Sequence, residues 1–140
     1  MTQAAEQVFP ELKIDKRNVL IISASRLPNS AVIEAWEAVD LAAEKLIHSH
    51  CSNIILDKDT RYKHIENILI SEKLLSTKQG KLFRELRQLR NKVAHAVGYE
   101  VDKVQAVQYI ELCFKLIEYL NNQLSTRLQV CQQSTNEIAS

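Results

Sequence analysis

The chain has 140 residues, a length that suits one domain with a hydrophobic core of its own. Its formal net charge is +1, which excludes a uniformly basic nucleic-acid-binding chain, so any such role must come from local charge. Apolar residues make up 46% of the chain beside two glycines and two prolines, a composition typical of long helices with short connections. We therefore predict an all-α antiparallel bundle of four to five helices.

The first half of the chain contains two predicted helices. Residues 1–14 are polar, and we expect them to be loosely ordered. Residues 16–25 fit a buried helical turn or a short strand, and we favour a helix because no other segment could pair with a strand. Apolar residues then recur every three or four positions over 31–48, which predicts a helix that Asn29 or Ser30 caps.

Two further helices are predicted between Asp59 and Gly98. Asp59 or Thr60 can cap the first of them. Ser76 or Thr77 can cap the second, which is long. Gly98 follows the apparent end of the long helix, at a place where a residue with positive φ is common.

The last predicted helix begins near Asp102 and is apolar on more than one side. One apolar stripe would be enough to pack it on the bundle, so we expect part of this helix to meet another chain. Residues 132–140 are polar and are expected to be loosely ordered, which leaves a single helical domain over residues 1–140. The apolar residues are Val104, Val107, Ile110, Leu112, Phe114, Leu116, Ile117, Leu120 and Leu124.

A polar cluster lies on the long helix that precedes Gly98. An α-helix turns by about 100° per residue, so with Leu82 at zero Arg90 lies at roughly 80°, Asn91 at 180° and His95 at 220°. Asn91 and His95 therefore lie opposite the predicted apolar stripe, and Arg90 lies at its edge. We interpret a polar cluster that avoids the core as a candidate site. The predicted stripe consists of Leu82, Leu86, Leu89, Val93 and Val97.

Basic residues repeat every three positions along the same helix. Lys81, Arg84 and Arg87 belong to this series, and Glu85 is the one acid between residues 78 and 95. A ridge of this kind provides contacts to phosphates, so we take these three residues as candidate RNA- or phosphate-binding groups. A solvated helix face is the alternative interpretation.

Three cysteines and the longest aliphatic run bear on location and cofactors. Cys51, Cys113 and Cys131 are odd in number, and no pair has metal-ligand spacing, which indicates reduced, buried cysteines in a cytoplasmic protein. The run Val19–Ile22 is too short to span a bilayer, so we expect no membrane segment in this chain. No cluster or glycine-rich loop indicates a metal or a cofactor.

The run from Leu86 to His95, LRQLRNKVAH, resembles the R-x-x-x-x-H signature of HEPN (higher eukaryotes and prokaryotes nucleotide-binding) domains, in which Asn often follows the Arg. The resemblance extends over residues 15–128, although residues 86–95 are its specific part. It implies a helical bundle that forms a homodimer, with the motifs of two chains in one cleft. Many members are metal-independent endoribonucleases of toxin, defence or RNA-processing systems.

Carried over by position, the resemblance makes Arg90, Asn91 and His95 the catalytic residues. RNA can be cut by its own 2′-hydroxyl, with a histidine transferring the proton and an arginine stabilising the phosphoryl charge. Asn91 would orient His95 or bind phosphate.

A second function class stays open beside the endoribonuclease. Many HEPN-like domains are non-catalytic modules that bind nucleotide, RNA or a partner protein, such as a cognate antitoxin or a regulatory protein. In that case His95 is a surface histidine near a helix end. Arg90 would then hold the bundle together by pairing with Glu37 or Glu44.

Overall fold

The computed structural model describes residues 15–50 and 61–139, with the side chains of residues 62 and 128–139 left out of the description. The described part is helical and contains no strand, which confirms the predicted all-α bundle of four to five helices. The predicted loose segment 1–14 lies outside the described residues. The helices are α2 (Lys16–Ser23), α3 (Pro28–His50), α4 (Arg61–Ser71), α5 (Thr77–His95) and α6 (Lys103–Ala139).

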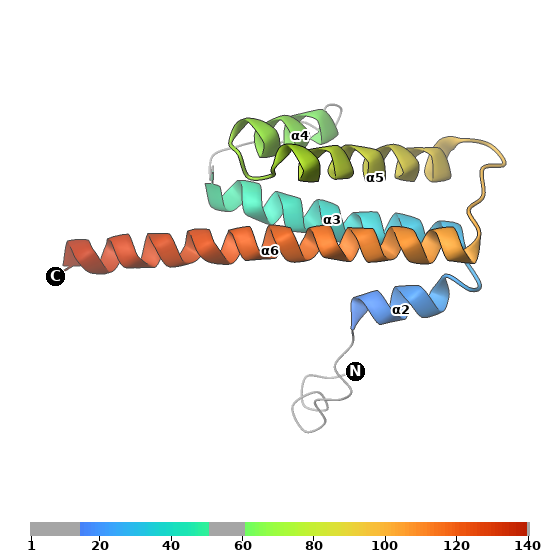
Figure 1. The fold of residues 1–140 in the computed structure, drawn as a ribbon, viewed down its shortest axis with the longest axis horizontal. Helices are drawn as coiled ribbons and strands as arrows, with labels where there is room; N and C mark the ends of the chain where they lie inside the picture. Colours follow the sequence, from blue (N-terminus) through green and yellow to red (C-terminus); the bar gives the residue numbers. More distant parts are fainter. Residues whose placement is uncertain (1–14, 51–60, 140) are drawn as a thin grey trace, which may run out of the picture.

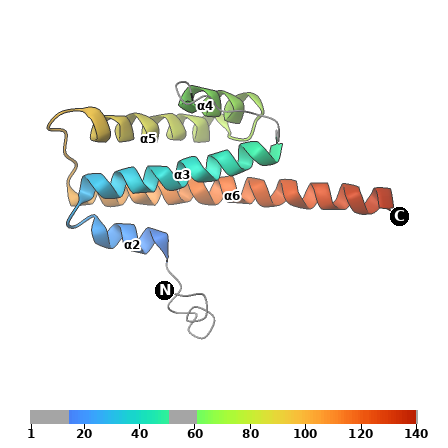
Figure 2. The same ribbon diagram turned by 180° about the vertical axis from the view of Figure 1, so that it is seen from behind.

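The bundle is built around α3, which contacts each of the other four helices (Figures 1 and 2). Successive long helices reverse direction, so α5 runs opposite to α3 and α6 (Figure 1). At the centre, the rings of Trp36 on α3 and Phe83 on α5 meet with their centroids 5.1 Å apart, and both side chains are fully buried. Trp36 is therefore a residue of the core.

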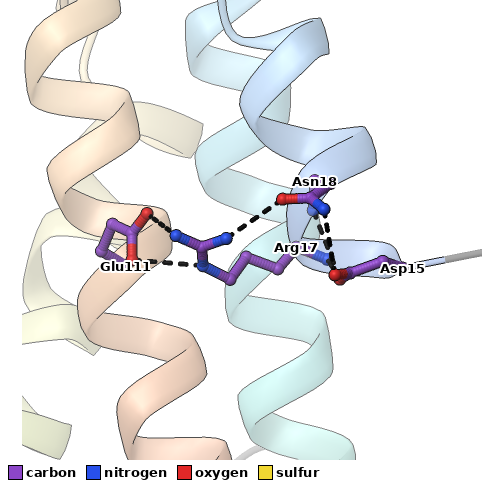
Figure 3. Close-up of polar contacts among 4 residues, drawn as sticks. All are labelled: Asp15, Arg17, Asn18 and Glu111. Carbon is purple, nitrogen blue, oxygen red and sulfur yellow. Dashed lines mark hydrogen bonds and ion pairs between the residues drawn. The ribbon is translucent and has the colours of Figure 1, made fainter.

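The helix α2 confirms that residues after 15 are helical rather than extended. Asp15 caps it, because the side chain of Asp15 accepts hydrogen bonds from the backbone N–H groups of Arg17 and Asn18. The guanidinium of Arg17 binds both carboxylate oxygens of Glu111 on α6 (Figure 3). The cap thus stabilises the start of this helix of eight residues, and the bidentate ion pair attaches the helix to the bundle.

The helix α3 starts earlier than predicted, and the expected cap is wrong. Pro28 occupies the first helical position, where its missing N–H costs no hydrogen bond. Asn29 therefore lies inside the first turn, and its side chain serves a distant segment instead. Its amide NH₂ donates to the carbonyl of Tyr99 at 3.0 Å, and its Oδ1 accepts from the N–H of Val101 at 3.0 Å.

The helix α5 begins as the sequence predicts and ends at His95, two residues before the end of the predicted apolar stripe. The hydroxyl of Ser76 accepts from the N–H of Gln79, which confirms Ser76 as the cap. The last helical residue is His95, and Gly98 has a φ of 75°, which confirms the positive φ predicted there. Val97 lies beyond the helix and is fully exposed, so its place in the predicted apolar stripe is wrong.

The helix α6 has a reciprocal cap at its start and projects from the bundle at its other end. The side chain of Asp102 accepts from the N–H of Gln105, while the side chain of Gln105 accepts from the N–H of Asp102. Figures 1 and 2 show that α6 continues past the end of α3. Its backbone is helical to Ala139, further than the polar composition of residues 132–140 led us to expect.

Cys113 lies on the buried side of α6 and is a free thiol, as the sequence predicts for it. Burial raises its pKa to about 12, so the side chain stays protonated and behaves as a small apolar group. Cys51 and the side chain of Cys131 lie outside the described residues.

We predict that Asn29→Ala lowers the free energy of unfolding by about 1–3 kcal/mol, because it removes two hydrogen bonds that no other described group replaces. Asn29→Asp keeps the acceptor for Val101 and loses the donor to Tyr99, so its effect should be intermediate. Urea denaturation followed by circular dichroism measures the change. Asn67→Ala is the control, because Asn67 is exposed on α4. Equal stability of the Asn29→Ala and Asn67→Ala proteins would contradict this prediction.

Candidate functional site

The structure turns α5 so that Arg90 lies on the buried side of the helix. Its buried face includes Gly80, Phe83, Leu86 and Val93, and therefore extends further round than the predicted stripe. Arg90 lies about 20° from Phe83 on the helical wheel and is half-buried, which agrees with its predicted place at the edge of the apolar stripe. The sequence pattern placed the apolar stripe correctly at Leu86 and Val93 but missed the wide face that α3 and α4 cover together.

Arg90 has one hydrogen-bond partner among the described residues, the neighbouring Asn91. Its Nη1 donates to Oδ1 of Asn91 at 3.3 Å, and its Nε is buried with no hydrogen-bond partner in the described part of the chain. Its charge also acts on the phenol of Tyr109 on α6. Burial nevertheless raises the pKa of Tyr109 far above its usual value, with Arg90 opposing the shift, so the phenol stays protonated. The hydroxyl of Tyr109 donates to the carbonyl of Leu86 at 2.8 Å.

His95, unlike Arg90, is exposed to solvent. It is the last residue of α5 and is exposed, and it makes no hydrogen bond or ion pair with the described residues. Asn91, which we expected to orient His95 or bind phosphate, instead accepts from Arg90. Within one subunit the structure therefore joins Arg90 to Asn91 and gives His95 no hydrogen bond to either of them.

The alternative in which Arg90 pairs with an acid of α3 finds no support among the described residues. Glu44 binds Arg61 of α4 at 3.1 Å and lies 3.6 Å from the ring of His48. Arg61 also binds Asp40 at 3.0 Å. Asp40 and Glu44 are thus engaged with Arg61, and Glu37 is exposed without an ion pair to any described residue. None of the ion pairs in the described part of the chain includes Arg90.

Two of the three predicted phosphate-binding residues have an acidic partner that the sequence analysis missed. Glu66 on α4 is only 7% exposed, and its two carboxylate oxygens lie 2.8 Å from Nε of Arg84 and 3.7 Å from Nη2 of Arg87. Arg84 remains about half-exposed, whereas Arg87 is largely covered. Lys81 is exposed and makes no ion pair with the described residues. Part of the basic ridge therefore binds α4.

The sequence around Glu66 contains an indication of a buried ion pair, but the indication is ambiguous. Glu66 lies next to Ile65 and close to Ile68 and Leu69, and all three apolar residues are buried. An acid beside inward apolar residues indicates a buried ion pair only if a cation faces it. The arginines that face it lie some twenty positions further along the chain, on another helix.

No group of three or more potential metal ligands gathers in the part of the chain that the structure describes. Among the same residues, no helix has the length and apolar character that crossing a membrane requires. Comparison with known proteins found no matching family model, no matching curated protein and no matching solved structure.

We predict that Glu66→Gln lowers the free energy of unfolding by about 1–2 kcal/mol, because a largely covered guanidinium at Arg87 would lose its acid. Thermal and urea denaturation measure this effect. Glu85→Gln is the matched control, since Glu85 is exposed on α5 and has no ion pair with the described residues. A Glu66→Gln protein as stable as the Glu85→Gln protein would show that the ion pair contributes nothing.

Proposed function

We propose that this chain is a HEPN-like, metal-independent endoribonuclease of the toxin or defence type, acting in the cytoplasm as a homodimer. The observation that carries the proposal is the exposed imidazole of His95, at the end of the helix that also bears Arg90 and Asn91. An exposed imidazole is free to meet the 2′-hydroxyl of an RNA strand. A half-buried arginine that is hydrogen-bonded to a neighbouring amide can provide a positive charge at a fixed position.

The proposed reaction needs a proton acceptor, a proton donor and a positive charge. The 2′-hydroxyl attacks the adjacent phosphorus while an imidazole of His95 takes its proton. The P–O5′ bond breaks, and the leaving 5′-oxygen receives a proton from an imidazolium, giving a 2′,3′-cyclic phosphate and a 5′-hydroxyl. Arg90 stabilises the charge that grows on the phosphoryl oxygens, and Asn91 positions the guanidinium.

The placement of these groups on one helix favours a site built from two chains. Arg90 and His95 lie about 140° apart around the axis of α5, and no hydrogen bond joins these two described residues within one subunit. A second copy of the chain can bring its own Arg90 to the exposed His95 of the first. The proposed homodimer thus supplies the pairing that a single subunit lacks.

We predict that the purified protein cuts labelled single-stranded RNA in the presence of a chelator and leaves 2′,3′-cyclic phosphate ends. His95→Ala and Arg90→Ala should each lower the cleavage rate by about a hundredfold or more, because they remove the proton transfer and the charge stabilisation respectively. His48→Ala and Arg26→Ala are the controls, since both residues are exposed and lie outside the motif. Cleavage that persists in either motif variant would refute the assignment of that residue.

We predict that mixing the two inactive variants restores cleavage. If each site takes His95 from one chain and Arg90 from the other, a mixed dimer of His95→Ala and Arg90→Ala chains contains one intact site. Random exchange of subunits should then restore about a quarter of the activity of the original protein. No recovery, when mass spectrometry shows that mixed dimers have formed, would mean that both groups act from the same chain.

A non-catalytic module that binds nucleotide, RNA or a regulatory partner such as an antitoxin is the second candidate. The ion pairs of Glu66 with Arg84 and Arg87 favour it, because they direct two cations of the ridge to a structural task. The RNA assay separates the two functions. RNA that is retained by the protein without being cut, with an affinity that falls steeply as salt is raised, would indicate the binding module.

A further inference from the structure

We propose that the groove between α5 and α6 binds an amphipathic helix of a partner protein, with acidic residues of that helix at the lysine-rich end of the groove. This inference does not rest on the endoribonuclease activity. The groove has two adjoining parts, which share Leu82, Glu85 and Leu112 as lining residues. One part is a hollow of about 280 Å³ that reaches Tyr99 and Val101, and the other is a hollow of about 480 Å³ that reaches Lys78 and Lys115.

The groove exists because α5 and α6 both pack on α3 more extensively than on each other. Its floor contains Leu86 and Tyr109, both buried. Leu112 stands on the α6 wall with 40% of its surface exposed, and Tyr99 is exposed to a similar degree. Apolar side chains that remain open to solvent in a concave surface favour an apolar partner. Leu112 is also one of the residues that make α6 apolar on more than one side.

The dimensions of the groove suit a helix. On α5 the lining residues run from Lys78 to Leu89, and on α6 from Gln105 to Leu116. Each wall is therefore about 16 Å long, which matches three turns of a third helix. The walls are helical, so they offer side-chain ridges rather than the open backbone groups that an extended peptide needs. A helix with apolar residues at positions i, i+4 and i+7 would place them over Leu82, Leu89 and Leu112.

Charge selects the chemistry of the bound helix. Lys78, Lys81 and Lys115 line one end of the groove, and Glu85 is the one acid among the residues that line its two parts. The opposite end is lined by the uncharged Gln105 and Gln108. An apolar helix with acidic residues at one end complements this arrangement, because its carboxylates would meet the lysines while its leucines fill the centre.

The test uses the full chain and two synthetic helical peptides, each of about 16 residues. Both carry leucines at i, i+4 and i+7, and they differ only in having three glutamates or three lysines at one end. Fluorescence anisotropy at low salt should show the glutamate peptide binding about tenfold more tightly than the lysine peptide. Leu112→Glu should lower the affinity for the glutamate peptide by about tenfold or more. Lys115→Glu should remove most of the difference in affinity between the two peptides.

Matched controls come from α3. Leu41 and Lys45 are exposed on α3 and do not line the groove, so Leu41→Glu and Lys45→Glu should leave the affinity of both peptides unchanged. Failure of both peptides to bind, or equal binding of the two, would overturn the proposal. It would also be overturned if sedimentation showed a dimer of this chain that Leu112→Glu dissociates, because a second copy would then occupy the groove.

Discussion

Burial of α3 is the constraint on which the arrangement of the other helices depends. Trp36 and Phe83 meet at the centre of the core, and a close-packed pair of large rings tolerates little rotation of either helix. Because Phe83 must face α3, the direction of every other side chain on α5 is fixed. Arg90 follows Phe83 by seven positions, which is nearly two turns, so it is drawn toward the core while His95 is turned to solvent.

Because the rotation of α5 is fixed, its different sides face different neighbouring helices. The side with Arg84 and Arg87 faces the buried carboxylate of Glu66 on α4, and the side with Leu82, Glu85 and Leu89 borders α6. A single α5 therefore cannot present the whole basic series to a polyanion. Phosphate that approached Arg84 and Arg87 would have to compete with Glu66 for both guanidinium groups. Lys81, which has no such competitor among the described residues, is the cation of the predicted set best placed for a phosphate.

The sequence predicted local features well and distant contacts poorly. The cap at Ser76, the start of a helix near Asp102 and the positive φ of Gly98 are consequences of nearby residues, and each could be inferred from a few positions. Asn29 was misassigned because the start of a helix offers a capping role, whereas its actual partners, Tyr99 and Val101, lie about seventy residues away. Glu66 escaped notice for the same reason. The exposure of His95 and the edge position of Arg90 were predictable from periodicity, but the width of the buried face, which includes Gly80 and Phe83, depended on the helices packed against α5.

The segment between α5 and α6 connects the two surfaces that carry the proposals. It begins directly after His95, and two of its residues, Tyr99 and Val101, line the groove. Asn29 binds the backbone of both, so the segment is tied to the start of α3 rather than free to follow α5 alone. His95 itself does not line the groove, and a helix bound there would leave its imidazole uncovered. A partner that pressed on Tyr99 would act on backbone four residues from His95. If the partner moved the backbone at Tyr99, the hydrogen bonds of Asn29 to this segment would limit how much of the movement reached the imidazole of His95.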